Sequence, residues 1–183
     1  MLIYLSFLAI INFAGNEKNF TNLKYKGNIM SNNYSDMIIY GPNGQINLLI
    51  QVKNKRGTSH DWAAQVRKDI LANKEIPETN LFLLALPDHF YLWKNSEKMP
   101  PEIYPSHSIN PNPLLTPYYK KIGIAPEKLS ADSFELIIFS LINELKMTKT
   151  VSSDIPKETR NWLLDSGIFN AINNGRISSG EKL

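Results

Sequence analysis

Residues 35–55, SDMIIYGPNGQINLLIQVKNK, consist of two apolar runs separated by the turn GPNG. Glycine and asparagine tolerate the positive φ angles of tight hairpin turns, so the two runs are predicted to pair as an antiparallel hairpin. Side chains alternate along a strand, so one face of the second run is expected to carry Ile46, Leu48, Ile50 and Val52. The other face then carries Gln51 and Lys53, close to Asp36 at the start of the first run.

Asp36, Gln51 and Lys53 combine a carboxylate, an amide oxygen and an ammonium group. Carboxylate and neutral oxygen ligands suit a hard cation such as Mg²⁺. A lysine beside such a cation orients a water molecule or stabilises charge that develops on a phosphate. These residues are therefore predicted to be catalytic in metal-assisted phosphodiester hydrolysis, with Mg²⁺ or Mn²⁺ as the cofactor. The alternative is structural: Asp36 caps a turn, and Lys53 is a solvated strand end.

The residues after Lys53 predict a basic loop, a helix and two further strands. Thr58 is expected to cap a crossover helix over residues 59–73. The apolar stripe of this helix is Trp62, Ala63, Val66, Ile70 and Leu71. The run LFLLAL at 81–86 is typical of a central strand buried on both faces, and FYLWK at 90–94 extends the sheet. The aromatic side chains of FYLWK are expected in the core rather than as platforms for base stacking.

With this order of hairpin, Gln51-Val52-Lys53 triplet, basic loop, helix and apolar strand, the chain resembles the PD-(D/E)XK nuclease superfamily over residues 34–94. In that superfamily an Asp opens one strand of a hairpin, and an acidic-x-Lys triplet lies on the next. Ser35 stands in place of the usual Pro, and Gln51 in place of the acidic residue, as in the Mrr-like restriction branch. The resemblance implies an α/β, restriction-endonuclease-like core with a mixed central sheet flanked by helices.

The resemblance further implies a metal-dependent nuclease that hydrolyses phosphodiester bonds in DNA. Asp36 and Gln51 would be metal ligands, the Val52 carbonyl would be a third, and Lys53 would position the attacking water. In several nuclease branches the crossover helix lends a polar side chain to the active site. Gln65 is the best-placed candidate, although a plain exposed glutamine is the favoured alternative. Because Gln51 removes one negative charge from the site, the alternative is an inactive nuclease-fold module that binds nucleic acid or a protein partner.

The composition is that of an ordinary globular protein whose 183 residues suffice for a single domain. The net charge of +3 permits contact with nucleic acid. Four basic side chains flank the predicted site and are candidates for phosphate contacts, namely Lys55, Arg56, Arg67 and Lys68. The chain has no cysteine, which excludes disulfides and thiolate zinc sites and fits a reducing, cytoplasmic location. The three histidines, His60, His89 and His107, are too dispersed to suggest a metal cluster.

The apolar residues 1–15, MLIYLSFLAIINFAG, are too few to span a bilayer as a helix and follow no basic segment. We expect a core helix or strand without membrane contact; a secretory signal or anchor is the alternative. The superfamily places a helix before its first strands, and some members carry an acidic residue there. Glu17 is its counterpart in this chain.

The C-terminal half is predicted to add helices over about 118–174. Six prolines between Asn95 and Pro117 predict an irregular surface connection before them. The amphipathic segment 133–146 predicts one helix, with Ser130 or Asp132 as its cap. A last helix is expected from about Pro156, broken or bent at Gly167, and residues 174–183 are expected to fray. These helices pack onto the domain or, alternatively, form a homodimer contact.

Overall fold

The computed structural model of the protein describes residues 36–72, 79–94 and 103–179. Its strands are β1 (Met37–Tyr40), β2 (Ile46–Val52), β3 (Leu81–Ala85), β4 (Phe90–Lys94), β5 (His107–Ile109) and β6 (Arg176–Ser179). Its α-helices are α2 (His60–Ala72), α3 (Asn112–Ile122), α4 (Ala131–Met147), α5 (Lys157–Asp165) and α6 (Ile168–Asn174), with a 3₁₀ turn at Pro126–Lys128. The expected N-terminal segments, including residues 1–15 and Glu17, lie outside the described residues.

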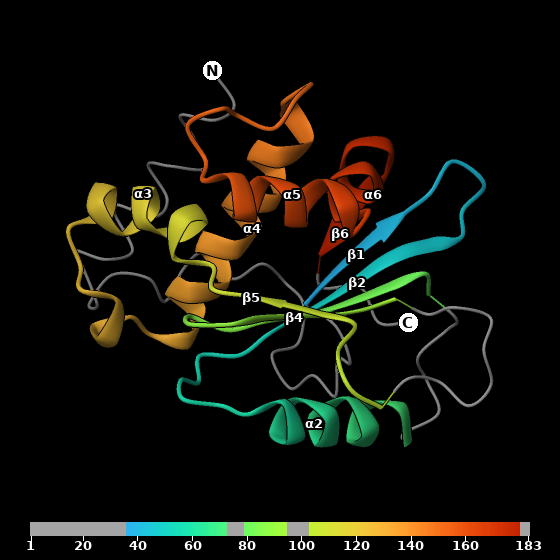
Figure 1. Ribbon diagram of the computed structural model, residues 1–183, viewed down its shortest axis with the longest axis horizontal. Helices are drawn as coiled ribbons and strands as arrows, with labels where there is room; N and C mark the ends of the chain where they lie inside the picture. Colours follow the sequence, from blue (N-terminus) through green and yellow to red (C-terminus); the bar gives the residue numbers. More distant parts are fainter. Residues whose placement is uncertain (1–35, 73–78, 95–102, 180–183) are drawn as a thin grey trace, which may run out of the picture.

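The strands form one six-stranded sheet in the order β5-β4-β3-β2-β1-β6. Strands β2 and β3 are parallel, because α2 connects them, and the other neighbouring strands are antiparallel. Helix α2 covers one face, while α3 to α6 lie on the other (Figure 1). The predicted α/β class with a mixed sheet flanked by helices is therefore confirmed. No helix within these described ranges is long and apolar enough to cross a membrane.

The predicted β1–β2 hairpin forms around the turn GPNG. The Gly41 N–H donates to the Gln45 carbonyl at 2.7 Å, and Gly44 has the positive φ of 79° that only glycine adopts without strain. The register then shifts by one residue, because Ile39 pairs with Leu48 but Tyr40 pairs with Ile46. The extra residue is a β-bulge.

The bulge changes the face that Ile46 occupies. Simple alternation placed Ile46 with Leu48 and Ile50, and this prediction was wrong for Ile46. Its side chain packs with Ile38 and Leu49 on the α2 face, whereas Leu48 and Ile50 belong to the core under α3 to α6. One inserted residue reverses the strand's alternation before the bulge and leaves it unchanged after it.

Strand β3 is buried along its whole length, as predicted for a central strand, and Tyr91 and Trp93 of β4 are core residues. Helix α2 begins one residue later than expected. Ser59, not Thr58, is the capping residue, since Ser59 Oγ accepts the Trp62 N–H at 3.1 Å. Leu71 at the end of the predicted stripe is exposed, so the apolar face of α2 is shorter than the sequence pattern indicated.

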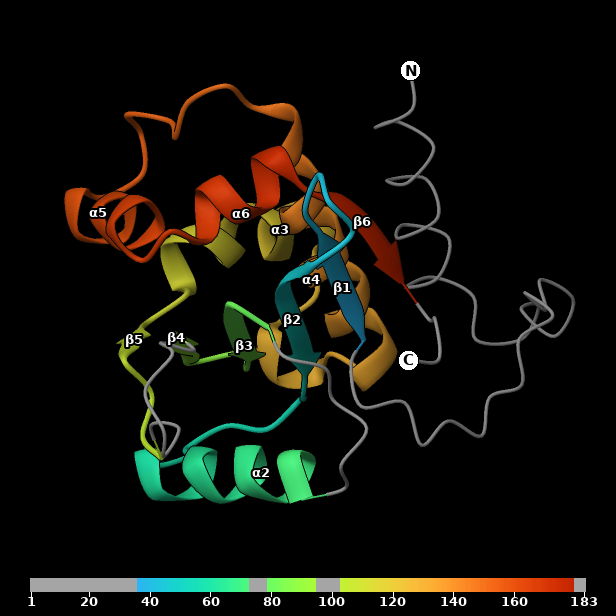
Figure 2. The same ribbon diagram turned by 90° about the vertical axis from the view of Figure 1, so that its right-hand side faces the viewer.

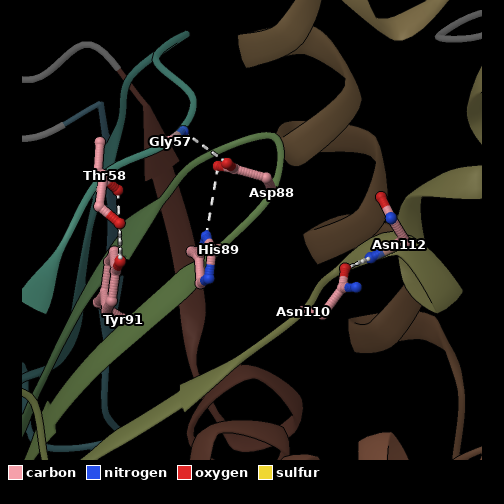
Figure 3. Close-up of polar contacts among 7 residues, drawn as sticks. All are labelled: Gly57, Thr58, Asp88, His89, Tyr91, Asn110 and Asn112. Carbon is pink, nitrogen blue, oxygen red and sulfur yellow. Dashed lines mark hydrogen bonds and ion pairs between the residues drawn. The ribbon is translucent and has the colours of Figure 1, made fainter.

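The proline-rich segment is more regular than predicted. It contains β5 and the start of α3, with Pro117 inside that helix. The Asn110 side chain accepts the Asn112 N–H at 2.9 Å where α3 begins (Figure 3). Helix α4 is capped by Ser130 as one of the two predicted alternatives, and its Oγ accepts the Ser133 N–H at 3.1 Å.

The last predicted helix is divided as expected at Gly167, which has a φ of 83°. The prediction that the tail frays was wrong for residues 176–179, which form β6 and pair with β1 at the sheet edge (Figure 2). Gly175 permits this close approach, because a Cβ there would overlap Ile39 Cγ2 and lie 2.7 Å from the Ala171 carbonyl. Lys146 of α4 donates to the Gly175 carbonyl and holds the turn before β6.

Candidate functional site

The carboxylate of Asp36 joins the start of β1 to the end of β2. Its Oδ2 accepts Gln51 Nε2 at 2.8 Å and the Val52 N–H at 2.5 Å. The Asp36 N–H in turn donates to the Ile50 carbonyl at 3.0 Å. The hairpin thus brings Asp36, Gln51 and Val52 to one end of the sheet. Gln51 is buried there, although it is polar.

Lys53 follows Val52 at the same end of the sheet. Its N–H donates to the Ala85 carbonyl at 3.0 Å, so the main chain is fixed to β3 on one side and to Asp36 on the other. Burial raises the pKa of Asp36 above its usual value, while the Val52 N–H, the Lys53 charge and the Gln51 amide each lower it. Desolvation outweighs these three contributions, so the ionised carboxylate is destabilised where it stands.

A second carboxylate approaches this site from α4, which the sequence analysis did not identify. The pKa of Glu135 is raised, first by desolvation and then by the negative charges of Asp36 and Asp132. Glu135 is an exposed residue overall, so its carboxyl is only partly shielded from water. Two nearby carboxylates with raised pKa values repel each other, and a cation between them would relieve that repulsion.

The start of α4 is held near the hairpin by the loop that follows Lys53. Asn54 Nδ2 donates to the Leu129 carbonyl at 2.7 Å, just before the cap of α4. This contact places the first turns of α4, which include Glu135, close to the loop after β2. The sequence shows only that Glu135 lies on the polar face of the 133–146 segment. Nothing in the sequence relates Glu135 to Asp36.

The donor atoms around Asp36 are of the kind that Mg²⁺ and Mn²⁺ prefer. They are the carboxylates of Asp36 and Glu135, the amide oxygen of Gln51 and the carbonyl of Val52. The Val52 N–H faces Asp36, and a residue in a strand directs its N–H and C=O to the same side. The Gln51 amide now presents its nitrogen, and a half-turn of the amide would present its oxygen instead. Hard oxygen ligands fit either cation.

Histidine, cysteine and carboxylate groups alone do not make such a site. In the ranges that the structure describes, no three or more of these side chains are grouped so that they could hold a metal ion. Any cation at Asp36 would therefore depend on the neutral oxygens of Gln51 and Val52. Fewer charged ligands imply a weaker site than one with an acidic residue at position 51.

Of the candidate side chains on helix α2, Arg67 is buried, whereas Gln65 and Lys68 are exposed. Gln65 is exposed, and its Nε2 donates to Asp69 Oδ1 at 2.7 Å on the same helix. Arg67 is only 4% exposed, and its guanidinium lies 5.4 Å from the centre of the Trp93 ring. The helical period places Arg67 beside Ala63 on the sheet-facing side, so it is a core residue rather than a surface phosphate ligand. Lys68 remains exposed.

The basic loop 53–58 is anchored to the turn between β3 and β4. The Gly57 N–H donates to Asp88 Oδ2 at 2.7 Å, and Tyr91 Oη donates to the Thr58 carbonyl at 3.0 Å (Figure 3). Lys55 and Arg56 are exposed within this anchored loop. Their positions are therefore constrained by the main chain on both sides, which lowers the entropy lost when they contact a ligand.

Comparisons with known proteins supply no further constraint. No protein-family model matches the chain, and no curated protein or solved structure matches it.

Proposed function

We propose that this protein is a metal-dependent nuclease that hydrolyses phosphodiester bonds in DNA, with a restriction-endonuclease-like core. The observation that carries the proposal is the position of Asp36. Its partly buried carboxylate has a raised pKa and lies beside Gln51, Lys53 and a second carboxylate, Glu135. Carboxyl groups whose pKa is shifted by burial and that lie beside a charged partner, as Asp36 lies beside Lys53, are characteristic of functional sites.

Each residue has a separate role in this proposal. Asp36 and Glu135 hold Mg²⁺ or Mn²⁺ with the oxygens of Gln51 and Val52. The bound cation would polarise the phosphate and lower the pKa of a coordinated water. Lys53 orients the attacking water and stabilises the negative charge that builds on the phosphate. Lys55 and Arg56 contact neighbouring phosphates, and the affinity for DNA is therefore expected to fall as salt rises.

A nuclease-fold module without catalysis is the second candidate. One observation favours it: Gln51 Nε2 donates to the Asp36 carboxylate at 2.8 Å and so partly satisfies that charge without a cation. An acidic residue at position 51 would instead repel Asp36 and require one. In this second function, the basic loop binds nucleic acid or a protein partner, and no bond is cleaved.

The two functions differ in metal binding and in cleavage. Mg²⁺ or Mn²⁺ titrated into the wild-type protein should raise its Tm, because a ligand that binds only the folded state stabilises it. The same protein should cleave labelled DNA only with metal. Lys53→Ala should abolish cleavage and keep the metal-induced rise in Tm, since Lys53 is not a ligand.

Lys157→Ala is the matched control, because Lys157 is an exposed lysine at the start of α5, which the proposal leaves out of the site. It should cleave as the wild type does. If metal leaves the Tm unchanged and the wild-type protein cleaves no DNA or RNA, the nuclease proposal fails and the non-catalytic module gains support.

A further inference from the structure

Two histidines that are far apart in the sequence contact one buried tyrosine ring. His89 stacks on Tyr91 with a centroid distance of 5.5 Å and an interplanar angle of 7°. His60, at the start of α2, meets the same ring edge-on at 5.3 Å and 72°. The Tyr91 ring itself is buried, whereas His60 is exposed and the His89 side chain is 41% exposed. The fold therefore places both imidazoles at one surface around a rigid support.

Each imidazole has one ring nitrogen beside a polar group of the protein. His89 Nδ1 is buried 3.5 Å from Asp88 Oδ1, so Nε2 is the nitrogen left for an external ligand. His60 Nε2 lies 3.2 Å from Ser108 Oγ, which leaves Nδ1. A neutral His89 with its proton on Nδ1 presents a lone pair at Nε2. Protonated His89 presents an N–H there instead, and only that form suits an anion.

Basic and acidic side chains both lie near these histidines. Asp88 uses Oδ2 to accept the Gly57 N–H, and its other oxygen faces His89. Lys55 lies 4.7 Å from the centre of the Trp62 ring, two residues after His60. Burial raises the pKa of the Tyr119 hydroxyl to about 12; the nearby Arg56 charge lowers it, and the charges of Glu127 and Asp88 raise it further. Other acidic groups nearby are Asp61, beside His60 on α2, and Glu127, which also influences Tyr119.

The histidines lie at the same end of the sheet as Asp36. Ala85, at the end of β3, pairs with both Val52 of β2 and Phe90 of β4, so His89 directly continues this row of strand ends. Strands β1 and β4 are three positions apart in the sheet. At a strand spacing of about 4.8 Å, this separates Asp36 from His89 by about 14 Å. A duplex rises about 3.4 Å per base pair, so a duplex lying along this row of strand ends would place about four base pairs between Asp36 and His89.

We propose that His60 and His89 form a phosphate-binding site for the DNA backbone about four base pairs from the bond held at Asp36, and that they bind it in their protonated form. The inference rests on the proposed function in that DNA is the ligand. It adds a contact that the basic loop does not supply, and it makes binding dependent on proton uptake. Asp88 is a positioning residue in this arrangement, because it turns Nδ1 inward.

The salt dependence of DNA binding provides the test. Binding of a fluorescein-labelled duplex is measured by anisotropy in EDTA, so that no cleavage intervenes, over a salt series at about pH 8 and about pH 6, the range in which histidines change charge. Each phosphate contact adds about 0.9 to the slope of log K against log salt. The wild-type slope should therefore be steeper at the lower pH by up to about 1.8, which is two contacts.

The double variant His60→Gln, His89→Gln should show the same slope at both pH values while keeping the wild-type affinity at the higher pH. His107→Gln is the matched control. His107 neighbours Ser108 on β5, and because strand residues alternate, it faces the other side of the sheet. This variant should keep the full pH effect.

Equal wild-type slopes at the two pH values, a pH effect that survives in the double variant, or no binding at either pH would each overturn the phosphate site. Cleavage with Mn²⁺ at about pH 8 is measured in parallel and tests the proposed function separately. A protein that cleaves DNA but shows no change in slope would retain the nuclease proposal and lose only the histidine site.

Discussion

Replacing Asp36 by asparagine or by alanine separates the structural contribution of this side chain from its functional one. In Asp36→Ala, the Val52 N–H and the buried Gln51 amide lose the oxygen that accepts them at 2.5 and 2.8 Å. A buried donor left without a partner costs about 1–3 kcal/mol, so the pair should cost about 3 kcal/mol in unfolding free energy. In a chain of this size that is a fall in Tm of about 6–12 °C.

Asp36→Asn should behave in the opposite way. The amide oxygen still accepts a hydrogen bond, and the buried charge and its repulsion with Glu135 disappear. We therefore expect its free energy of unfolding at pH 7 to equal that of the wild type or to exceed it by up to about 1 kcal/mol. The sign follows from the raised pKa of Asp36, because protonation is favoured in the native state. The stability that protonated Asp36 contributes is fully present below its unfolded pKa of 3.8, and it is lost as the pH rises through its native pKa.

The advantage of Asp36→Asn over the wild type should consequently vanish near pH 3.8 and grow toward neutral pH. Thermal unfolding followed by circular dichroism at several pH values measures it. Metal supplies the second half of the test: at 100 times its Kd, Mn²⁺ should stabilise the wild type by about 2.7 kcal/mol and the asparagine variant hardly at all. An asparagine variant as unstable as the alanine variant, or equal metal stabilisation of wild type and asparagine variant, would refute this reasoning.

Three further substitutions have defined outcomes. Gln51→Glu should tighten Mg²⁺ binding, measured by calorimetry, and lower the metal-free Tm at pH 7, because a new carboxylate lies beside Asp36; unchanged affinity would count against Gln51 as a ligand. Glu135→Gln should raise the metal-free Tm at neutral pH, since the raised pKa of Glu135 makes its charge unfavourable, and should weaken metal binding. Equal metal affinity would remove Glu135 from the site. Gly175→Ala should destabilise the protein by about 1–3 kcal/mol in denaturant unfolding, because its Cβ would overlap Ile39; an unaffected midpoint would contradict that packing.

The β1–β2 hairpin and the central position of β3 could be predicted because they depend on short-range patterns. The turn GPNG contains the residue that adopts positive φ, and a continuous apolar run suits a strand that is covered on both faces. Gln51 could likewise be placed beside Asp36, since alternation and a tight turn relate neighbouring strands. The bulge was not predictable by alternation, so Ile46 was assigned to the wrong face.

Burial of charged groups was harder to infer. Arg67 has the sequence signature of a surface residue, yet it is buried and its guanidinium lies over the Trp93 ring. Long basic side chains cover apolar surface while their charged ends find partners, so composition alone does not show which of them are accessible. Lys55 and Arg56 could be recognised as part of a basic loop. That Asp88 anchors this loop could not be predicted, because Asp88 and Gly57 are distant in the sequence.

The sequence by itself determined the α/β class, strands β1 to β4, the hairpin and the proximity of Asp36, Gln51 and Lys53, because these follow from local backbone preferences. Only the tertiary structure decided that Glu135 approaches Asp36, that residues 176–179 pair with β1, and that His60 and His89 share the Tyr91 ring. These contacts join distant parts of the chain. They form because the two faces of the sheet must be covered by helices, and the packing of those helices, rather than any local pattern, brings the polar side chains to one end of the sheet.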